Sequence, residues 1–287
     1  MTKLRLAAAM GLSVLLLAFG VSPAIAAAAP AAAPAATPKA APAKGAPGTA
    51  ARRKGGRRGS QATTTAIVEP AALKALQRMG DYLSTLTTFT VQSETSLDLV
   101  TEDGQRIQLD GVANYKVRRP DGFVIQVNTA AAKRTYYYDG KSFTISAPEL
   151  GYYATAPAPP TIVQTLDVLY DKFGVALPLE DLFRWSDPTL NRSDSLTSGF
   201  VVGASTIDGV ATDQYAFREG DIDWQIWIQH DGDPLPRKLV IIDRTDPAYP
   251  AYTARLTWNV SPSLAAADFT FQPGKDDKPI RLTAAGQ

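Results

Sequence analysis

The stretch FTVQSETSLDLVTEDGQRIQLDGVANYKV, residues 89–117, carries the pattern that decides the fold. Apolar residues such as Val91 and Leu97 alternate with polar ones on both sides of Asp103-Gly104. Such alternation gives each antiparallel strand one apolar and one polar face. Asp-Gly suits two-residue hairpin turns, because Gly accepts a positive φ freely and Asp tolerates it. The stretch therefore predicts a β-hairpin with one buried face.

The same dipeptide punctuates the rest of the chain. Asp-Gly occurs six times, at residues 103–104, 110–111, 121–122, 139–140, 208–209 and 231–232. Further strands are expected at 123–127, 136–138, 143–145, 152–154, 200–207, 210–218, 222–228, 237–243 and 252–260, with a last short piece at 268–271. The pattern predicts about ten or eleven antiparallel strands.

Helical spacing appears before and between the strands. Residues 70–86 carry Leu73, Leu76, Met79 and Leu83 at helical intervals after Pro70. Three prolines at 157, 159 and 160 end the first strand set, and helices are expected at 161–173 and 178–185. An antiparallel sheet of this size must curl, split or close. We therefore expect a mainly β (α+β) fold, a curved antiparallel sheet or open half-barrel with helices covering its concave side.

The N-terminus has the composition of an export signal. Lys3 and Arg5 precede an apolar run at 6–21, and Ala24-Ile25-Ala26 is a small-residue cleavage site. A permanent membrane anchor is the alternative, but the run is short for a span of about 20 residues. The sequence predicts a cleaved signal at 1–26, a linker at 27–65, a domain at 66–287 and a periplasmic location.

The predicted linker is rich in Ala, Pro and basic residues and lacks apolar periodicity, as is typical of disordered spacers. Residues 1–65 hold nine Lys or Arg and no acid, so the rest has 20 basic against 28 acidic residues. A basic cluster could contact an anionic surface, or could be a solvated linker, which we favour. Its residues are Arg52, Arg53, Lys54, Arg57 and Arg58. A nucleic-acid partner is not expected outside the cytoplasm.

Catalytic and cofactor signals are weak. The chain has no cysteine, which excludes disulfides and thiolate metal sites. His230, the single histidine, lies beside the turn at 231–232, where a surface role is favoured over that of a catalytic base. Asp221 and Asp223 share one phase of a strand, which is more typical of a solvated face than of a glycosidase pair. The sequence predicts no enzyme, cofactor or metal site.

Four blocks of sequence carry a family resemblance. They are YYDGK at 137–141, YYATAP at 152–157, DWQIWI at 223–228 and LPRKLVI at 235–241. Together they resemble a bacterial family of predicted periplasmic proteins of unknown function, which is similar to the lipoprotein-localisation factors with the LolA/LolB-like fold. The resemblance implies an open half-barrel with a helical lid over an apolar cavity that binds acyl chains.

The inward-facing apolar residues are the candidates for lining such a cavity. They are Phe89, Val91, Leu97, Tyr115, Phe123, Ile125, Tyr137, Trp224 and Ile226. Trp227 lies on the opposite phase from Trp224 and is expected to be exposed or to lie under the helices. Whether the cavity is open or filled by side chains stays undecided from sequence.

The leading hypothesis is a periplasmic, non-catalytic binding protein that holds an acyl chain, a lipoprotein or another apolar ligand. The runner-up is a cell-envelope sensor or scaffold that binds a protein partner and has a packed interior. A free strand edge would be a pairing surface for that partner. A hydrolase using His230 ranks third.

Overall fold

The computed structural model describes residues 68–101, 103–130, 132–185 and 195–283. The predicted signal, linker and basic cluster lie outside the described residues. So does the end of the chain, residues 284–287.

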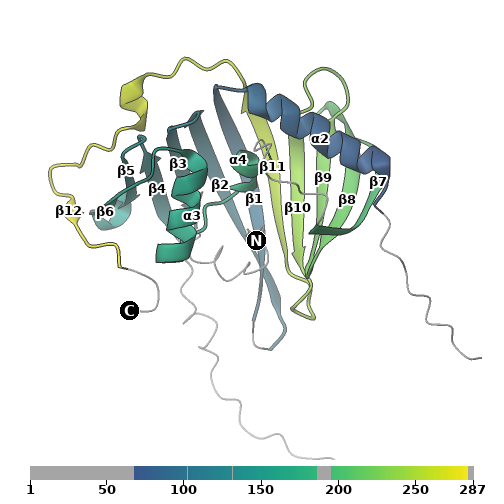
Figure 1. Cartoon of the computed structure of the whole chain (residues 1–287). Coiled ribbons are helices and arrows are strands. Elements are labelled where there is room, and N and C mark those ends of the chain that lie inside the picture. The colour runs from purple at the N-terminus through teal and green to yellow at the C-terminus, as the bar shows by residue number, and fades with distance from the viewer. Residues whose placement is uncertain (1–67, 102, 131, 186–194, 284–287) are drawn as a thin grey trace, which may run out of the picture.

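The described chain forms one twelve-stranded sheet in the order β12-β6-β5-β4-β3-β2-β1-β11-β10-β9-β8-β7. Neighbours pair antiparallel except β12 and β6, which pair parallel. The sheet curves and stays open, with β7 at one edge and β12 at the other (Figure 1). This confirms the predicted curved, open, mainly β fold. The strands are β1 (Thr88–Val100), β2 (Arg106–Arg118), β3 (Gly122–Thr129), β4 (Lys133–Tyr138), β5 (Ser142–Ala147), β6 (Tyr152–Pro157), β7 (Leu196–Ile207), β8 (Val210–Glu219), β9 (Ile222–Gln229), β10 (Pro236–Asp243), β11 (Ala251–Asn259) and β12 (Lys278–Pro279).

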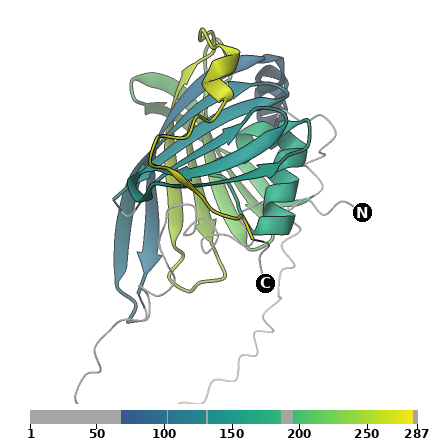
Figure 2. The same cartoon turned by 90° about the vertical axis from the view of Figure 1, so that its left-hand side faces the viewer.

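Three α-helices lie on the same face of the sheet (Figures 1 and 2). They are α2 (Pro70–Thr85), α3 (Ile162–Phe173) and α4 (Asp181–Arg184). In α2, Ala72, Ala75, Met79 and Leu83 are buried, whereas the predicted Leu73 and Leu76 lie at the border of that face. Among the described residues, two 3₁₀ helices, η3 (Pro148–Leu150) and η5 (Ala266–Phe269), complete the regular structure.

The boundaries of α3 follow from its capping residues. The Thr161 hydroxyl accepts a hydrogen bond from the Gln164 backbone N–H at 3.3 Å. Gly174 ends the helix in the left-handed conformation at φ 66°. Both positions satisfy backbone groups that a helix leaves unpaired at its ends. The predicted helix at 161–173 is therefore confirmed.

The Asp-Gly dipeptides do not all serve as turns. Asp208 and Gly209 have φ values of 51° and 81°, as a tight hairpin turn requires. Asp110-Gly111 instead lies inside β2, so the turn expected there is wrong. A Cβ on Gly111 would lie 3.0 Å from Thr129 Cγ2 on β3, which explains the glycine by close packing of neighbouring strands.

After β11, the chain crosses the outer face of the sheet, the face opposite the helices, and leads to β12 (Figure 2). We call residues 260–280 the C-terminal strap. Phe269 is buried in η5 under the Arg118 guanidinium, whose Cζ lies 4.6 Å from the ring centroid. The expected last strand at 268–271 is therefore wrong, because this segment packs through side chains and not through a ladder. Within the described residues, no helix has the length and apolarity needed to cross a membrane.

Candidate functional site

The concave face of the sheet, which lies under the helices, is apolar across its width. Val91 pairs in register with Tyr115, and Tyr115 pairs with Ile125, so their side chains share this face. Eight of the nine predicted cavity residues are buried and belong to one hydrophobic core. They are Phe89, Val91, Leu97, Tyr115, Phe123, Ile125, Trp224 and Ile226.

Tyr137 is the exception, and its predicted place in the cavity is wrong. It pairs in register with Val124 and Thr144, whereas its neighbours Tyr136 and Tyr138 are the buried core residues. The Tyr137 ring instead packs against Phe271 of the C-terminal strap, with centroids 5.3 Å apart. Three successive tyrosines alternate faces, so their apolarity alone does not identify the inward pair.

Residues 175–185, which we call the cover segment, lie over the concave face and contact β2, β3 and β9. Their buried apolar side chains are Ala176, Leu177, Leu179, Leu182 and Phe183. The Phe183 and Phe123 rings lie 6.2 Å apart, and the Tyr115 hydroxyl donates a hydrogen bond to the Pro178 carbonyl at 3.1 Å. The space between the sheet and this segment is therefore filled by packed side chains.

The cover segment also carries charges into the interior. Glu180 is buried, and its Oε1 lies 3.5 Å from Arg184 Nε, while its Oε2 has no hydrogen-bond partner. Arg184 Nη2 bonds Asp167 of α3 at 3.0 Å. Burial raises the pKa of Glu180 to about 7, although the Arg184 guanidinium opposes that rise. Burying a carboxylate whose oxygens are only partly paired costs free energy, and this cost lowers the stability of the closed cover segment.

Arg119 lies beneath the cover segment, at the start of the turn between β2 and β3. Its Nη2 donates to the Leu182 carbonyl at 3.4 Å, and its Cζ lies 5.7 Å from the Phe89 ring centroid. Its Nε has no hydrogen-bond partner in the described structure. Burial lowers the pKa of this guanidinium to about 10.

The concave face holds a few polar atoms among its apolar side chains. Ser93 Oγ, Thr95 Oγ1 and Trp224 Nε1 are buried and make no hydrogen bond within the described structure. Trp224 stacks on Phe217, with centroids 4.4 Å apart, and faces Trp185 at 6.3 Å. Buried polar groups are nearly always paired in folded proteins, so these atoms are candidate anchors for a bound molecule.

A second hollow lies on the outer face, over β11, β1, β2 and β3. This groove has a volume of about 560 Å³; most of its lining residues are polar, but the surface that they expose to it is mostly apolar. They include Glu94, Ser96, Asp110, Asn128, Thr253 and Arg255. Arg255 is already paired with Asp208 at 2.9 Å.

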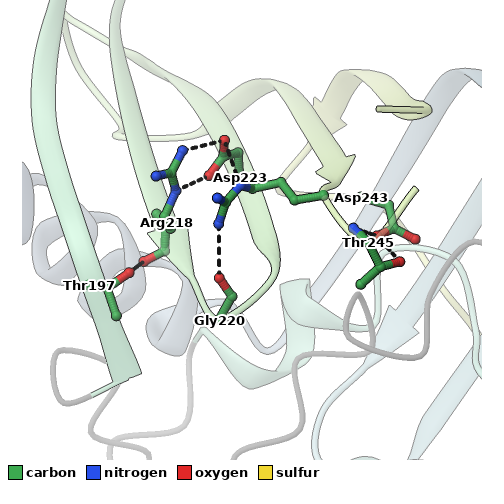
Figure 3. A network of polar contacts seen from close by, with 7 residues as sticks. Thr197, Arg218, Gly220, Asp223, Asp243 and Thr245 are labelled. Atoms are coloured by element: carbon green, nitrogen blue, oxygen red, sulfur yellow. Dashed lines mark hydrogen bonds and ion pairs between the residues drawn. The ribbon is translucent and has the colours of Figure 1, made fainter. Parts of the chain in front are cut away.

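The carboxylates singled out from sequence have structural partners. Asp223 bonds Arg218 at 2.5 and 2.8 Å, and Arg244 Nε lies 3.7 Å from its Oδ2 (Figure 3). The Asp221 carbonyl accepts a hydrogen bond from the Arg244 backbone N–H at 2.9 Å. These contacts stabilise the turn between β8 and β9 and give Asp223 the role of an ion-pair partner.

His230 and Trp227 lie away from the concave face. His230 Nδ1 lies 2.8 Å from Asp213 Oδ2, and its side chain is exposed. Trp227 is buried on the outer face under Lys238, whose ammonium lies 4.5 Å from the ring centroid. Within the described part of the chain, no group of three or more His, Asp or Glu side chains is arranged to hold a metal ion.

The fold and the apolar concave face define a protein of the open half-barrel class. The chain belongs to a family described as predicted periplasmic protein (DUF2092), whose profile matches residues 72–283. No curated protein matches the chain significantly.

Solved structures resemble the chain only remotely. The lipoprotein LppX of Mycobacterium tuberculosis is 14% identical, with 67% of this chain and 100% of that chain covered at a TM-score of 0.42. LprF from Mycobacterium bovis is 14% identical, with 72% and 99% covered at a TM-score of 0.43. A LolA superfamily protein from Nitrosomonas europaea is 9% identical, with 70% and 97% covered at a TM-score of 0.34. These likenesses are too remote to assign a ligand.

Sequence reasoning missed the buried polar residues of the site. Arg119 and Glu180 have no periodic signature, and charged residues are normally read as exposed. One available signal was the apolar context of Glu180, which follows Leu177 and Leu179 and precedes Leu182. The unpaired Trp224 Nε1 depends on the tertiary packing of β9 and has no sequence signal.

Proposed function

We propose that this protein is a non-catalytic periplasmic carrier that binds an acyl chain, or another long apolar ligand, on the concave face of its half-barrel. The ligand replaces the cover segment. The observation that carries the proposal is the mismatch between the concave face and the cover segment. The face is apolar, whereas its cover buries Glu180 and leaves Glu180 Oε2 unpaired.

The energetics of exchange support a long ligand. Burying each methylene contributes about 0.8 kcal/mol, so a twelve-carbon chain contributes on the order of 10 kcal/mol. Exposing the buried side chains of Leu177, Leu179, Leu182 and Phe183 costs roughly 1.5–3 kcal/mol each. The two sums are similar, so net affinity comes from the length of the chain and from the release of the buried charge. Binding should strengthen about fourfold with each added methylene.

Polar anchors are available for the head of such a ligand. Trp224 Nε1 and Ser93 Oγ are buried without partners, and either can donate a hydrogen bond to an ester or carboxyl oxygen. Arg119 offers an unpaired Nε beneath the cover. A few polar groups in an apolar site fix the orientation of a ligand.

The direct test is a titration of the full chain with fluorescent fatty acids of increasing length, together with mass spectrometry of lipids that copurify with it. Saturable binding that strengthens with chain length supports the proposal. Absence of saturable binding and of copurifying lipid would contradict it.

A second function is favoured by one observation, the filled interior beneath the cover segment. In that case the protein is an envelope sensor or scaffold that binds a protein partner through its outer surfaces, and the packed concave face is a structural core. The same titration separates the two functions, because a scaffold with a permanent core takes up no acyl chain.

A further inference from the structure

The two edges of the sheet differ in how far their backbone groups are hydrogen-bonded. At one edge, β12 covers β6: the Lys278 N–H bonds the Gly151 carbonyl and the Ile280 N–H bonds the Tyr153 carbonyl, both at 2.8 Å. At the other edge lies β7, which pairs only with β8 among the described strands (Figure 1). An uncovered edge presents a row of free backbone donors and acceptors.

Part of β7 is nevertheless occupied by the start of the domain. The Glu69 N–H bonds the Gly199 carbonyl at 2.8 Å, and the Val201 N–H bonds the Glu69 carboxylate at 3.0 Å. Val68 forms a parallel bridge with Gly199. Beyond these contacts, residues 202–206 have no backbone partner other than β8 within the described chain.

The composition of β7 lacks the charges and prolines that normally prevent edge pairing, although its register with β8 shifts between Val201 and Gly203, at the start of the free stretch. Its twelve residues, LTSGFVVGASTI, contain no charged side chain and no proline. Natural edge strands are usually protected by lysine, proline, a β-bulge or an inward-pointing charge, and of these β7 has only the bulge. Phe200, Val201 and Val202 are also exposed, at 45%, 40% and 47%. An exposed neutral strand with apolar side chains is a pairing surface.

We infer that residues 202–206 of β7 pair antiparallel with the same residues of a second copy of this chain. A neutral strand is compatible with itself, because self-pairing opposes no like charges. A two-fold axis places the middle of the free stretch opposite itself, and that residue is Ala204. The pairing joins two twelve-stranded sheets edge to edge and removes the free edge of each.

The same inference predicts a weak dimer. A stretch of five paired residues buries less surface than a standard protein interface. The exposed Phe200, Val201 and Val202 add apolar contact at its end. Association is therefore expected to depend on protein concentration. It should not depend on any ligand on the concave face.

Sedimentation or light scattering of the full chain over a concentration series tests the pairing. The wild type should form a dimer, and Ala204→Lys should be monomeric, because it places two lysines opposite each other. Ile280→Lys is the matched control at the covered edge, where Ile280 is 53% exposed; it should remain dimeric. Circular dichroism checks that both variants fold.

Two results overturn the inference. If the wild type stays monomeric, the free edge does not pair with a second copy and is left to a strand from another protein. If the dimer persists in Ala204→Lys, it forms through another surface. Single cysteines give a second readout, since the chain has none of its own. Residues opposed across the axis lie about 4.5–5.5 Å apart, within disulfide range. Ala204→Cys should cross-link strongly, and cross-linking no stronger than in Ile280→Cys would contradict the pairing.

Discussion

Helix α2 and the cover segment lie on the same concave face, yet they are built on different principles. α2 is a sixteen-residue helix that buries only apolar residues and Gly80. The cover segment is mostly irregular and buries Glu180 together with its leucines. A regular apolar helix is a permanent part of a core, whereas a segment with a poorly paired buried charge opens at lower cost. Under the proposed function, α2 is a permanent part of the fold and the cover segment is the element that exchanges with the ligand.

The largest effect is expected where the cover meets the sheet. Phe123 is fully buried between Tyr138, Phe143 and Phe183. Phe123→Ala should lower the free energy of unfolding by roughly 3–5 kcal/mol and weaken binding of an acyl probe, because the side chain supports both states. Urea denaturation and probe titration measure the two effects. Unchanged probe affinity in a folded variant would place the ligand elsewhere.

Truncating one buried side chain in α2 and one in the cover segment distinguishes the two elements most clearly. Met79→Ala in α2 should lower the free energy of unfolding by about 2–5 kcal/mol without improving probe affinity. Phe183→Ala should instead raise probe affinity by tenfold or more, because the competing cover loses buried area. Its loss of global stability should be the smaller of the two, since it is limited by the free energy of opening the cover. Equal behaviour of the two variants would remove the distinction.

Glu180 makes the stability of the cover segment dependent on pH. Its pKa in the folded chain, about 7, lies above the ordinary value of 4.5, because burial disfavours the carboxylate. The stability that the neutral carboxyl provides is complete below about pH 4.5 and is lost as the pH rises to 7. The loss is on the order of 3 kcal/mol at most. Probe affinity should therefore rise between pH 5 and 8, as the cover weakens.

Glu180→Gln should flatten both pH profiles, whereas Glu149→Gln, an exposed glutamate paired with Lys133, should leave them unchanged. The groups that face Glu180 are Arg184, Asp181 and, through Arg184, Asp167. A steep profile that persists in Glu180→Gln would assign the titration to another group.

The smallest effect is expected at the contact between α2 and the cover segment. A Cβ on Gly80 of α2 would lie 2.5 Å from the Trp185 carbonyl oxygen, at the end of the cover segment. Gly80→Ala favours the helix by about 1 kcal/mol but forces Trp185 away. We expect a modest net loss of thermal stability and a small gain in probe affinity. As a control, Asp223→Asn at the partly exposed ion pair of Figure 3 should cost about 1 kcal/mol and leave affinity unchanged.

Much of the fold could be predicted because its elements carry local signals. The alternation through Val91, Leu97 and Tyr115 gives the strands and their buried face, and Thr161 marks the start of α3. Tyr137 was misplaced because tyrosines occupy both phases of β4. The strap contact of Phe271 joins segments far apart in sequence and follows no period.

The site was harder to predict than the fold. The apolar residues of the concave face follow from strand phase, so eight of them were identified together. Arg119 and Glu180 are buried only because the cover segment folds back over the sheet, which is a tertiary event. Local propensity does not indicate which charged residues such an event encloses.

Hydrogen exchange of the full chain with and without a long-chain acyl ligand tests the central claim most directly. The account predicts that the ligand speeds the exchange of amides in the cover segment, residues 175–185, while the amides of α2 and of the central strands keep or gain protection. Faster exchange confined to the cover segment would identify it as the exchangeable element. A saturating ligand that leaves the cover segment unchanged, or that protects the outer groove instead, would contradict the account.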